Sequence, residues 1–428
     1  MIKKVSLVIL SAILIFTTTY KTNALNFTLR EMESQNELKE IDRNFYYVTM
    51  FQKVINSFPV ETEKKYESID SYKEDNLNAE KNIDMKEVIK FPEEYAGAYI
   101  DETNALHIIL TKSVETEYNY QKITDYDKGV VFDYANFSLS QLYEIQHNLD
   151  IVMQKYSVET TVLNEIKNVV EIELLDSLQE KDIVEYLKSN IIDFKEESIF
   201  FKVGKGVKAT ATTNPSNNAI SGSKIINSSD SQDWATIGFN AYNGQKYGLV
   251  TAGHFATSGK TLKNSNGTTI GSMTESQFSG NVDAAFVPFS SSITKSYKVL
   301  NGFSSDQNDN ITDFIENDYA PVGMNTEKHG AATGHNSGAV VSASVTVNVE
   351  GRVTLTDLME VSNEQDFGDS GGPVLNCPYT GYLEPGYIRP LALIGIACEG
   401  KSNGHALVSK AQNVFKALSV SLYRYIYK

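Results

Sequence analysis

Three residues in the second half of the chain have the types and the order needed to cleave an acyl bond: His254, Asp283 and Ser370. Ser370 lies in the stretch Phe-Gly-Asp-Ser-Gly-Gly-Pro-Val at 367–374, and His254 ends the stretch Leu-Val-Thr-Ala-Gly-His at 249–254. A serine hydroxyl is a poor nucleophile near neutral pH and needs a neighbouring base. We therefore expect His254 to accept the proton of Ser370 and Asp283 to orient the imidazole.

The glycines around Ser370 predict a tight backbone turn. A turn of this kind can point its N–H groups at a reacting carbonyl, which a Cβ atom would obstruct. We expect the N–H groups of Gly368 and Ser370 to form an oxyanion hole. The alternative is a serine in an ordinary glycine-rich turn, which the length of the motif disfavours.

More than one aspartate lies in the right place along the chain to be the acid of the constellation. Asp306, Asp309 and Asp313 also lie between His254 and Ser370, but in a polar stretch that predicts a solvated loop. Asp283 directly precedes the apolar run Ala-Ala-Phe-Val, where a buried carboxylate would need a partner such as an imidazole. We therefore prefer Asp283.

The order His, Asp, Ser is the order of the chymotrypsin-type triad. With the blocks at 249–254, 281–288 and 367–374, the chain resembles the chymotrypsin-like serine peptidases. The segments 220–224 and 330–340 look like those of the bacterial streptogrisin and α-lytic group. This resemblance implies an all-β catalytic domain of two perpendicular six-stranded antiparallel β-barrels with the active site between them. It also implies that the first half is a pro-region that assists folding and then inhibits.

The resemblance also suggests a substrate pocket, with walls at 364–368 and 398–400. The residues that it assigns to substrate binding are Glu364, Phe367, Cys398, Glu399, Gly400 and Gly404. Glu364, Asp366 and Glu399 make these segments acidic, which favours Lys or Arg before the scissile bond. The alternative is that these side chains point to solvent.

Two features depart from the group. Neither cysteine flanks His254, and Cys398 stands where relatives have a serine that hydrogen-bonds the triad carboxylate. We expect Cys398 to be a buried thiol that is not bonded to Cys377, because the two would lie at opposite ends of a hairpin, beyond disulfide reach. Asp369 needs a cationic partner if buried. Relatives use a freed N-terminus or an internal arginine, and Arg352 is the nearest arginine upstream.

Composition divides the chain near residue 205. Only three of the 27 glycines precede residue 206, and the first half carries most of the net charge of −16. We expect a signal peptide at 1–24, an acidic α+β pro-region at 25–208, a linker and processing region at 209–223, and the peptidase domain at 224–428. A membrane anchor is the alternative for the first segment, but its apolar run at 5–16 is short.

Local patterns predict several elements. In the first half we expect strands on either side of 101–104, a capped helix from Leu139, a strand at 169–175 and a charged helix over 179–199. The second half reads as short strands and turns, followed by a terminal helix over 410–425. His107, His147, His335 and His405 are expected to be structural.

The function that these observations favour is a secreted serine endopeptidase made as an inactive precursor. We expect no metal and no cofactor, since no Cys pair and no His/Cys spacing predicts a metal site. The negative charge disfavours a nucleic-acid partner. Expected partners are protein or peptide substrates and the chain's own pro-region, and the enzyme is expected to be monomeric. Two alternatives remain: a secreted binding protein on the same fold, and a first half that is an independent interaction domain.

Overall fold

The computed structural model describes residues 43–65, 84–111, 114–153, 155–174, 179–203, 218–255, 259–300, 309–316, 320–349, 353–376 and 389–426. Contacts divide the chain into two compact units, Met1–Arg43 and Asn44–Lys428, and every described residue except Arg43 belongs to the second. We call residues 44–203 the N-terminal region and residues 218–426 the C-terminal region. The expected signal peptide and Cys377 lie outside the described residues. No described helix is long and apolar enough to cross a membrane.

The N-terminal region is α+β. Its helices are α2 (Arg43–Asn56), α4 (Val114–Ile123), α5 (Leu139–Asp150) and α6 (Glu180–Asn190), with a 3₁₀ turn, η2, at Glu196–Ser198. Its strands are β1 (Val60–Lys65), β2 (Asp84–Ile89), β3 (Tyr95–Ile100), β4 (Leu106–Leu110), β5 (Val130–Tyr134), β6 (Val158–Asn164), β7 (Val169–Leu174) and β8 (Ile199–Val203). They form the sheets β1-β2, β3-β4-β5 and β6-β7-β8, the last being part of a larger sheet.

Helix α5 begins as its sequence predicts. The hydroxyl of Ser138 accepts the N–H of Gln141, and the side chain of Gln141 accepts the N–H of Ser138. This capping box satisfies two backbone donors that the first turn leaves without helical partners. The apolar residues at helical spacing, Leu139, Leu142, Ile145 and Leu149, are buried.

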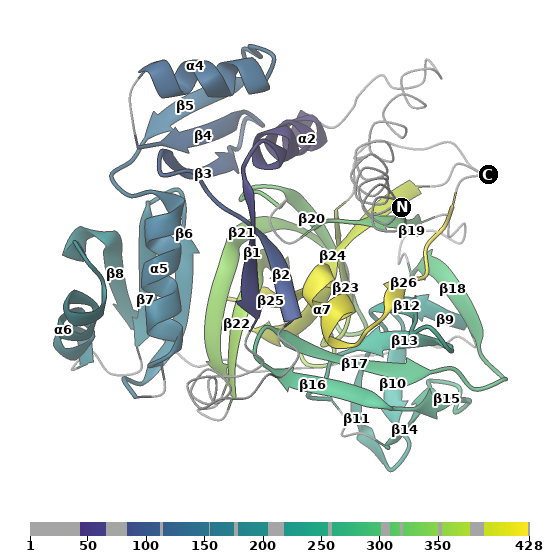
Figure 1. Cartoon of the computed structure of the whole chain (residues 1–428). Helices are drawn as coiled ribbons and strands as arrows, with labels where there is room; N and C mark the ends of the chain where they lie inside the picture. The colour runs from purple at the N-terminus through teal and green to yellow at the C-terminus, as the bar shows by residue number, and fades with distance from the viewer. Residues whose placement is uncertain are drawn as a thin grey trace, which may run out of the picture. The chain divides into compact units, whose positions relative to one another are not determined.

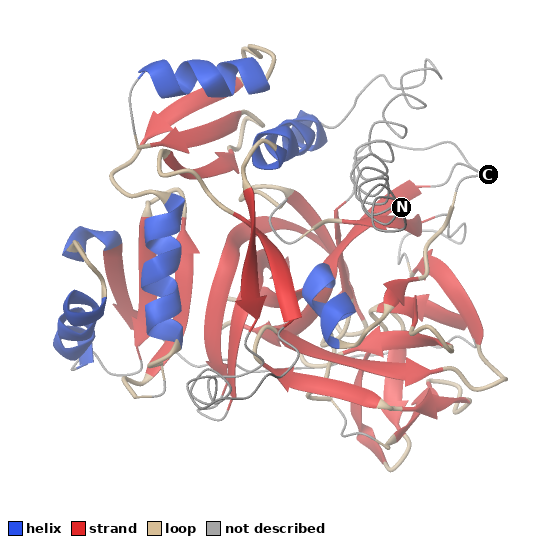
Figure 2. Ribbon diagram, in the orientation of Figure 1, coloured by secondary structure: helices blue, strands red, loops and turns tan. Residues whose placement is uncertain are grey.

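The C-terminal region consists almost entirely of strands (Figure 2). They are β9 (Asn218–Ser221), β10 (Lys224–Asn227), β11 (Asp230–Thr236), β12 (Phe239–Tyr242), β13 (Tyr247–Thr251), β14 (Thr261–Asn264), β15 (Thr269–Ser272), β16 (Glu275–Ser279), β17 (Val282–Pro288), β18 (Thr294–Val299), β19 (Asp309–Phe314), β20 (Asn325–Gly330), β21 (Gly334–Val349), β22 (Val353–Glu364), β23 (Pro373–Asn376), β24 (Arg389–Gly400), β25 (His405–Lys410) and β26 (Ser421–Leu422). One helix, α7 (Ala411–Ala417), lies between β25 and β26.

Six of these strands close a barrel. Strand β20 pairs with β21, β21 with β22, β22 with β25, β25 with β24, β24 with β23, and β23 with β20, all antiparallel. The other C-terminal strands include the two sheets β11-β10-β14-β15 and β16-β17-β13-β12-β26. A separate apolar core, which includes Ile225, Leu249, Leu262 and Val287, lies between them. The expected class, an all-β part after an α+β region, is confirmed. Of the two expected six-stranded barrels, one is closed among the described residues, whereas strands of the other part form these two separate sheets.

The two regions share a sheet. Strand β6 pairs antiparallel with β21, with Val162 opposite Val345 and Thr160 opposite Val347. The sheet therefore runs from β8 through β7 and β6 into the closed barrel (Figure 1).

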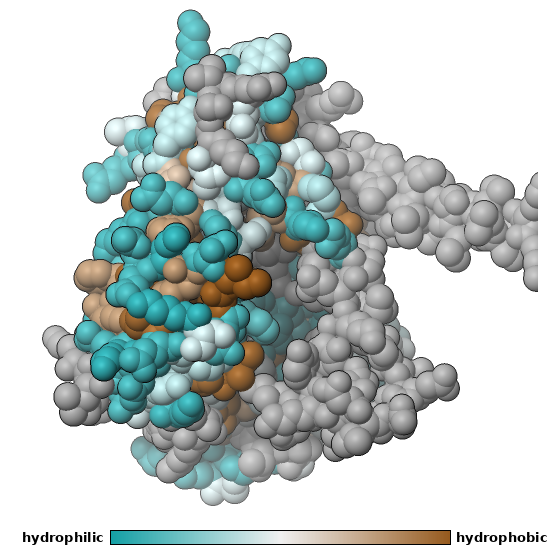
Figure 3. All heavy atoms as spheres, turned by 60° about the vertical axis from the view of Figure 1, so that its left-hand side comes forward, coloured by the Kyte–Doolittle hydropathy of each residue, from teal (hydrophilic) through white to brown (hydrophobic). Residues whose placement is uncertain are grey.

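The surface of the molecule that lies on the left in Figure 1 is mostly hydrophilic. Apolar groups are interspersed among its hydrophilic side chains (Figure 3). The apolar side chains of the N-terminal region are mainly buried, in a core that includes residues of α2, α5, β3 and β4.

Two strands expected from local sequence patterns are present, whereas two expected helices are shorter than predicted. The strands around 101–104 are β3 and β4, and the strand expected at 169–175 is β7. The helix expected over 179–199 was too long, because Ile191 is extended and Asp193 has a φ of 59°. The helix expected over 410–425 was also too long. Ser419 has a φ of 50°, which ends α7, and the following β26 pairs with β12.

One part of the expected linker belongs to the folded C-terminal region. Residues 218–221 form β9, which pairs with β18. The amide of Asn240 donates to the carbonyl of Ala219, at 2.7 Å. Residues 209–217 lie outside the described residues.

Candidate active site

The backbone brings His254 and Asp283 together. Strands β13 and β17 are neighbours with Thr251 opposite Ala285, so His254, just beyond β13, lies level with Asp283 on β17. Nδ1 of His254 is 2.5 Å from Oδ2 of Asp283. The other carboxylate oxygen accepts the backbone N–H groups of Gly253 and His254 at 2.7 and 2.8 Å. Asp283 is fully buried, so its carboxylate is held in place and in turn orients the imidazole. Nδ1 contacts this carboxylate, and Nε2 is the ring nitrogen that does not.

Two further residues surround the carboxylate and the imidazole. The N–H of Asp283 donates to the hydroxyl of Ser409 on β25, at 3.0 Å. A carboxylate oxygen of Glu399 on β24 lies 3.7 Å from Nδ1 of His254. The imidazole thus has two carboxylates beside it, and neither Ser409 nor this position of Glu399 was expected from sequence.

The electrostatic result is a strongly basic imidazole. Burial lowers the pKa of His254, but the charge and hydrogen bond of Asp283 and the charge of Glu399 outweigh burial and raise the pKa to about 9. The same two carboxylates act on Cys398. Burial and then the charges of Asp283 and Glu399 raise the pKa of the Cys398 thiol well above its usual value, which keeps the thiol protonated.

Ser370 lies in the turn between β22 and β23 and is buried. Its hydroxyl donates to the carbonyl of Cys398 at 3.1 Å. Within the described part of the chain it makes no hydrogen bond with His254. Ser370 and His254 are nevertheless both close to β24, since one contacts Cys398 and the other lies beside Glu399.

The turn around Ser370 has the shape that its glycines predict. Gly368 has a φ of 91° and Gly371 a φ of 85°, a backbone region that favours glycine. The carbonyls of Gly368 and Ser370 are held by Thr236, whose hydroxyl donates to the first at 2.5 Å and whose N–H donates to the second at 2.9 Å. Among the described residues, the N–H groups of Gly368 and Ser370 donate no hydrogen bond, so both can receive an acceptor from outside. Thr236 was not expected from sequence, because nothing in its local context marks it.

Asp369 has a lysine as its cationic partner. Nζ of Lys328 on β20 lies 2.5 Å from Oδ2 of Asp369, and both side chains are fully buried. The hydroxyl of Thr333 and the N–H groups of Ala332, Thr333 and Asp366 also donate to this carboxylate. Burial lowers the pKa of Lys328, and the charge of Asp369 opposes this effect. Arg352, the nearest upstream arginine, lies outside the described residues.

Cys398 is buried and free, as expected, and its thiol makes no hydrogen bond with Asp283. Its Sγ donates to the carbonyl of Leu407 at 3.2 Å. The thiol therefore does not take the place of the serine that relatives use at this position, because the neighbouring strand β25 offers it a backbone acceptor. The polar partner that β25 offers to Asp283 is Ser409.

The segments expected to form a substrate pocket lie side by side. The N–H of Gln365 donates to the carbonyl of Gly404 at 3.0 Å, and Gly400 on β24 pairs with Ala406 on β25. Cys398, Glu399 and Gly400 are buried, whereas Phe367 is exposed. Glu364 and Asp366 are also exposed, as in the alternative in which these side chains point to solvent. Only Glu399 of the three acids is directed at the candidate site.

No protein-family model matches the chain. Among solved structures, the chain is similar to protease A of Thermobifida fusca, with 23% identity over 49% of this chain and 100% of that one, and a TM-score of 0.40. It is similar to a chymotrypsin of Cellulomonas bogoriensis, with 23% identity over 49% and 100% of the two chains and a TM-score of 0.39. A protease of Nocardiopsis has 24% identity over 48% and 98%, and a TM-score of 0.40.

The first prediction concerns Lys328. Lys328→Met in a chain that also carries Ser370→Ala should lower the free energy of unfolding by about 3–5 kcal/mol, because Asp369 is left buried without a cation. Urea denaturation measures this change. Lys328→Arg should lose less, and Lys246→Met, at an exposed position, should stay within about 0.5 kcal/mol of the parent. A Lys328→Met chain as stable as its parent would contradict the assignment of this pair.

The second prediction concerns the protonation of His254. In the Ser370→Ala chain, NMR should find His254 protonated at pH 7 and titrating near pH 9, because two carboxylates favour its charged form. Glu399→Gln removes one negative charge and should move the titration to lower pH. Glu275→Gln, an exposed acid on β16, is the matched control and should leave it unchanged. A His254 that titrates near its ordinary value of about 6.5 would refute this electrostatic account.

Proposed function

We propose that the chain is a serine endopeptidase that cleaves peptide bonds through Ser370, His254 and Asp283. The observation that carries the proposal is the buried Asp283 carboxylate, which holds the His254 ring at 2.5 Å while also binding two backbone N–H groups. The turn of Ser370 supports it, because that turn leaves two nearby N–H groups free to bind an oxyanion.

The mechanism begins with a change at the nucleophile. Only the neutral form of His254, which its pKa of about 9 makes the minor form at pH 7, can act as the base. In that form the Ser370 hydroxyl turns from the Cys398 carbonyl toward Nε2 of His254 and gives up its proton as Oγ attacks the substrate carbonyl carbon. The developing oxyanion accepts hydrogen bonds from Gly368 and Ser370. His254 then protonates the leaving amine, the C–N bond breaks, and an acyl-enzyme remains. A water molecule then gives a proton to His254 and attacks the ester carbonyl. His254 returns this proton to Oγ of Ser370 as the ester C–O bond breaks, and the carboxylic acid product leaves.

The third prediction tests this function. A fluorophosphonate probe should label the processed chain at Ser370, and Ser370→Ala should abolish the labelling. Ser370→Ala, His254→Ala and Asp283→Asn should each lower peptidase activity by about 10⁴-fold or more. Ser231→Ala, at an exposed serine on β11, is the matched control and should keep full activity.

The same experiment separates this function from its alternatives. A folded chain that neither reacts with the probe nor cleaves peptides would instead be a binding protein on this fold. An Asp283→Asn chain with nearly full activity would refute the assignment of the acid.

We further propose that residues 25–208 act as a pro-region of an exported precursor, with removal of residues 1–24, and that they aid folding and inhibit until released. Long-range strand pairing makes β-rich domains slow to fold, and a preformed strand can serve as a template. The pairing of β6 with β21 supports this role. So do side-chain contacts between the regions: Ser344 donates to Gln146 at 2.7 Å, and Ser342 donates to the carbonyl of Leu163 at 2.8 Å.

One buried acid at this contact makes pro-region binding sensitive to pH. Asp150, at the end of α5, has a buried carboxylate oxygen that makes no hydrogen bond within the described part of the chain. Burial raises the pKa of Asp150 to about 7; the hydroxyl of Thr346 on β21 lowers it, and the charge of Asp357 adds to the rise. Glu173 also faces the C-terminal region, through Lys401. Because the bound state favours protonated Asp150, binding is strongest below about pH 4 and weakens as the pH rises to about 7.

The fourth prediction concerns Asp150. The Ser370→Ala chain, cut in the linker by an added protease, should remain a complex at pH 5 and separate more readily at pH 8. As the pH rises between the ordinary pKa of Asp150 and its raised value of about 7, ionisation of Asp150 should weaken binding of the pro-region by up to about tenfold per pH unit. Asp150→Asn cannot ionise, so it should reduce the difference between the two pH values. Gel filtration at several concentrations measures this difference.

The matched control is Glu185→Gln, which removes an exposed carboxylate from α6 and should keep the pH dependence of the parent. A complex whose stability is equal at pH 5 and pH 8, or an Asp150→Asn chain with unchanged pH dependence, would contradict the role given to Asp150. Full peptidase activity of the uncut chain would contradict inhibition by the pro-region itself.

A further inference from the structure

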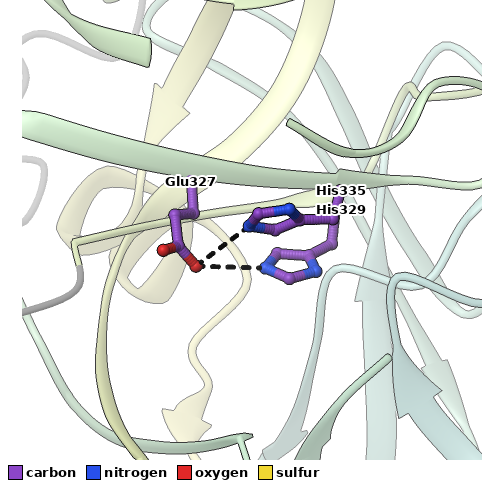
Figure 4. A group of neighbouring side chains, drawn as sticks. All are labelled: Glu327, His329 and His335. Atoms are coloured by element: carbon purple, nitrogen blue, oxygen red, sulfur yellow. Dashed lines mark ion pairs between the residues drawn. The ribbon is translucent and has the colours of Figure 1, made fainter. Parts of the chain in front are cut away.

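We propose that Glu327, His329 and His335 form a binding site for a divalent transition metal, best suited to zinc (Figure 4). This site is separate from the candidate active site and does not depend on the proposed function. The sequence predicted no metal, because the three residues match none of the familiar ligand spacings. The pairing of β20 with β21 is what brings them together.

The hairpin geometry places the three side chains on one face. His329 on β20 is directly opposite His335 on β21. Glu327 is two residues before His329, and residues two apart in a strand point to the same face. Lys328, between them, points to the other face and reaches Asp369.

The distances suit a tetrahedral ion. Oε2 of Glu327 lies 3.3 Å from Nε2 of His335 and 3.8 Å from Nε2 of His329. All three donor atoms lie within 4.8 Å of one another. A zinc ion with ligands at about 2.0–2.1 Å in tetrahedral geometry holds them about 3.3 Å apart. Small side-chain movements therefore suffice to bind the ion, and a water molecule can take the fourth position.

His329 is prepared for a metal. Its side chain is only 1% exposed, and its Nδ1 lies 3.0 Å from the carbonyl of Leu300. That hydrogen bond puts the proton on Nδ1 and leaves the lone pair on Nε2, which is the arrangement seen in metal-binding histidines. Nε2 points toward Glu327 and has no hydrogen-bond partner among the described residues.

The other two ligands provide access and charge. His335 and Glu327 are 15% and 13% exposed, so an ion can enter from their side of the cluster. One carboxylate with two imidazoles is a typical donor set for zinc, whereas magnesium and calcium prefer oxygen ligands alone. A hydrogen-bonded Glu327–His335 pair without metal is the competing explanation. That explanation does not account for Nε2 of His329, which is buried and has no hydrogen-bond partner among the described residues.

Titration of the full chain carrying Ser370→Ala with zinc chloride tests the proposal, since this chain cannot digest itself. We expect one zinc ion per chain by calorimetry, a higher midpoint of thermal unfolding with zinc than with EDTA, and the visible absorption of tetrahedral cobalt when cobalt(II) is used instead. His335→Gln and Glu327→Gln should each weaken zinc binding by more than the roughly 10- to 100-fold that loss of an outer hydrogen-bond partner costs.

His335 and Glu327 are chosen because they are partly exposed, so their variants should fold even if variants of the buried His329 do not. His147→Gln, at an exposed histidine on α5, is the matched control and should bind zinc like the parent. The cluster of His254, Asp283 and Glu399 is the other group that could hold an ion among the described residues. Loss of binding in His254→Gln but not in His335→Gln would assign the ion there and overturn the proposal, as would absence of zinc binding by the parent chain.

Discussion

The buried ion pair between Lys328 and Asp369 is the interaction on which the candidate site depends. Both side chains are fully buried, so their separate desolvation would cost several kcal/mol per ion unless each charge were compensated. Compensation is complete at Asp369, because three N–H groups and a hydroxyl join Lys328 around the carboxylate. The pair therefore fixes the residue next to Ser370 to strand β20. An internal lysine also means that this contact is made without a newly freed N-terminus.

The rest of the site is assembled from two cores. His254 and Asp283 belong to the sheet of β13 and β17, whereas Ser370 belongs to a turn of the closed barrel. Thr236 links them, since it binds the carbonyls beside Ser370 and accepts the N–H of Ala331, while its own carbonyl accepts the hydroxyl of Thr251. The turn that bears Ser370 is thus held both by the barrel strands and by the neighbouring core, which limits its freedom to move.

The β20–β21 hairpin takes part in three features at once. One face of β20 supplies Lys328 to Asp369, and the other face carries the histidine and glutamate cluster. Farther along, β21 pairs with β6 of the N-terminal region. Because side chains alternate along a strand, a single hairpin can contact the turn of Ser370 on one side and carry the proposed metal site on the other. An ion bound there would restrain the same strand that positions Lys328.

The sequence by itself pointed to His254, Asp283 and Ser370 as the proposed triad, and it determined the glycine-rich turn, the capped helix α5 and the change from an α+β to an all-β region. Each of these features depends on a short contiguous motif or on composition, so it can be predicted without knowing which distant residues come into contact. Only the tertiary structure decided the partner of Asp369, the partners of Asp283 and Cys398 on β25, the place of Thr236 and the meeting of Glu327 with His329 and His335. Those contacts join residues distant in sequence or opposite across strands, and they depend on strand register, which no local pattern in these segments specifies.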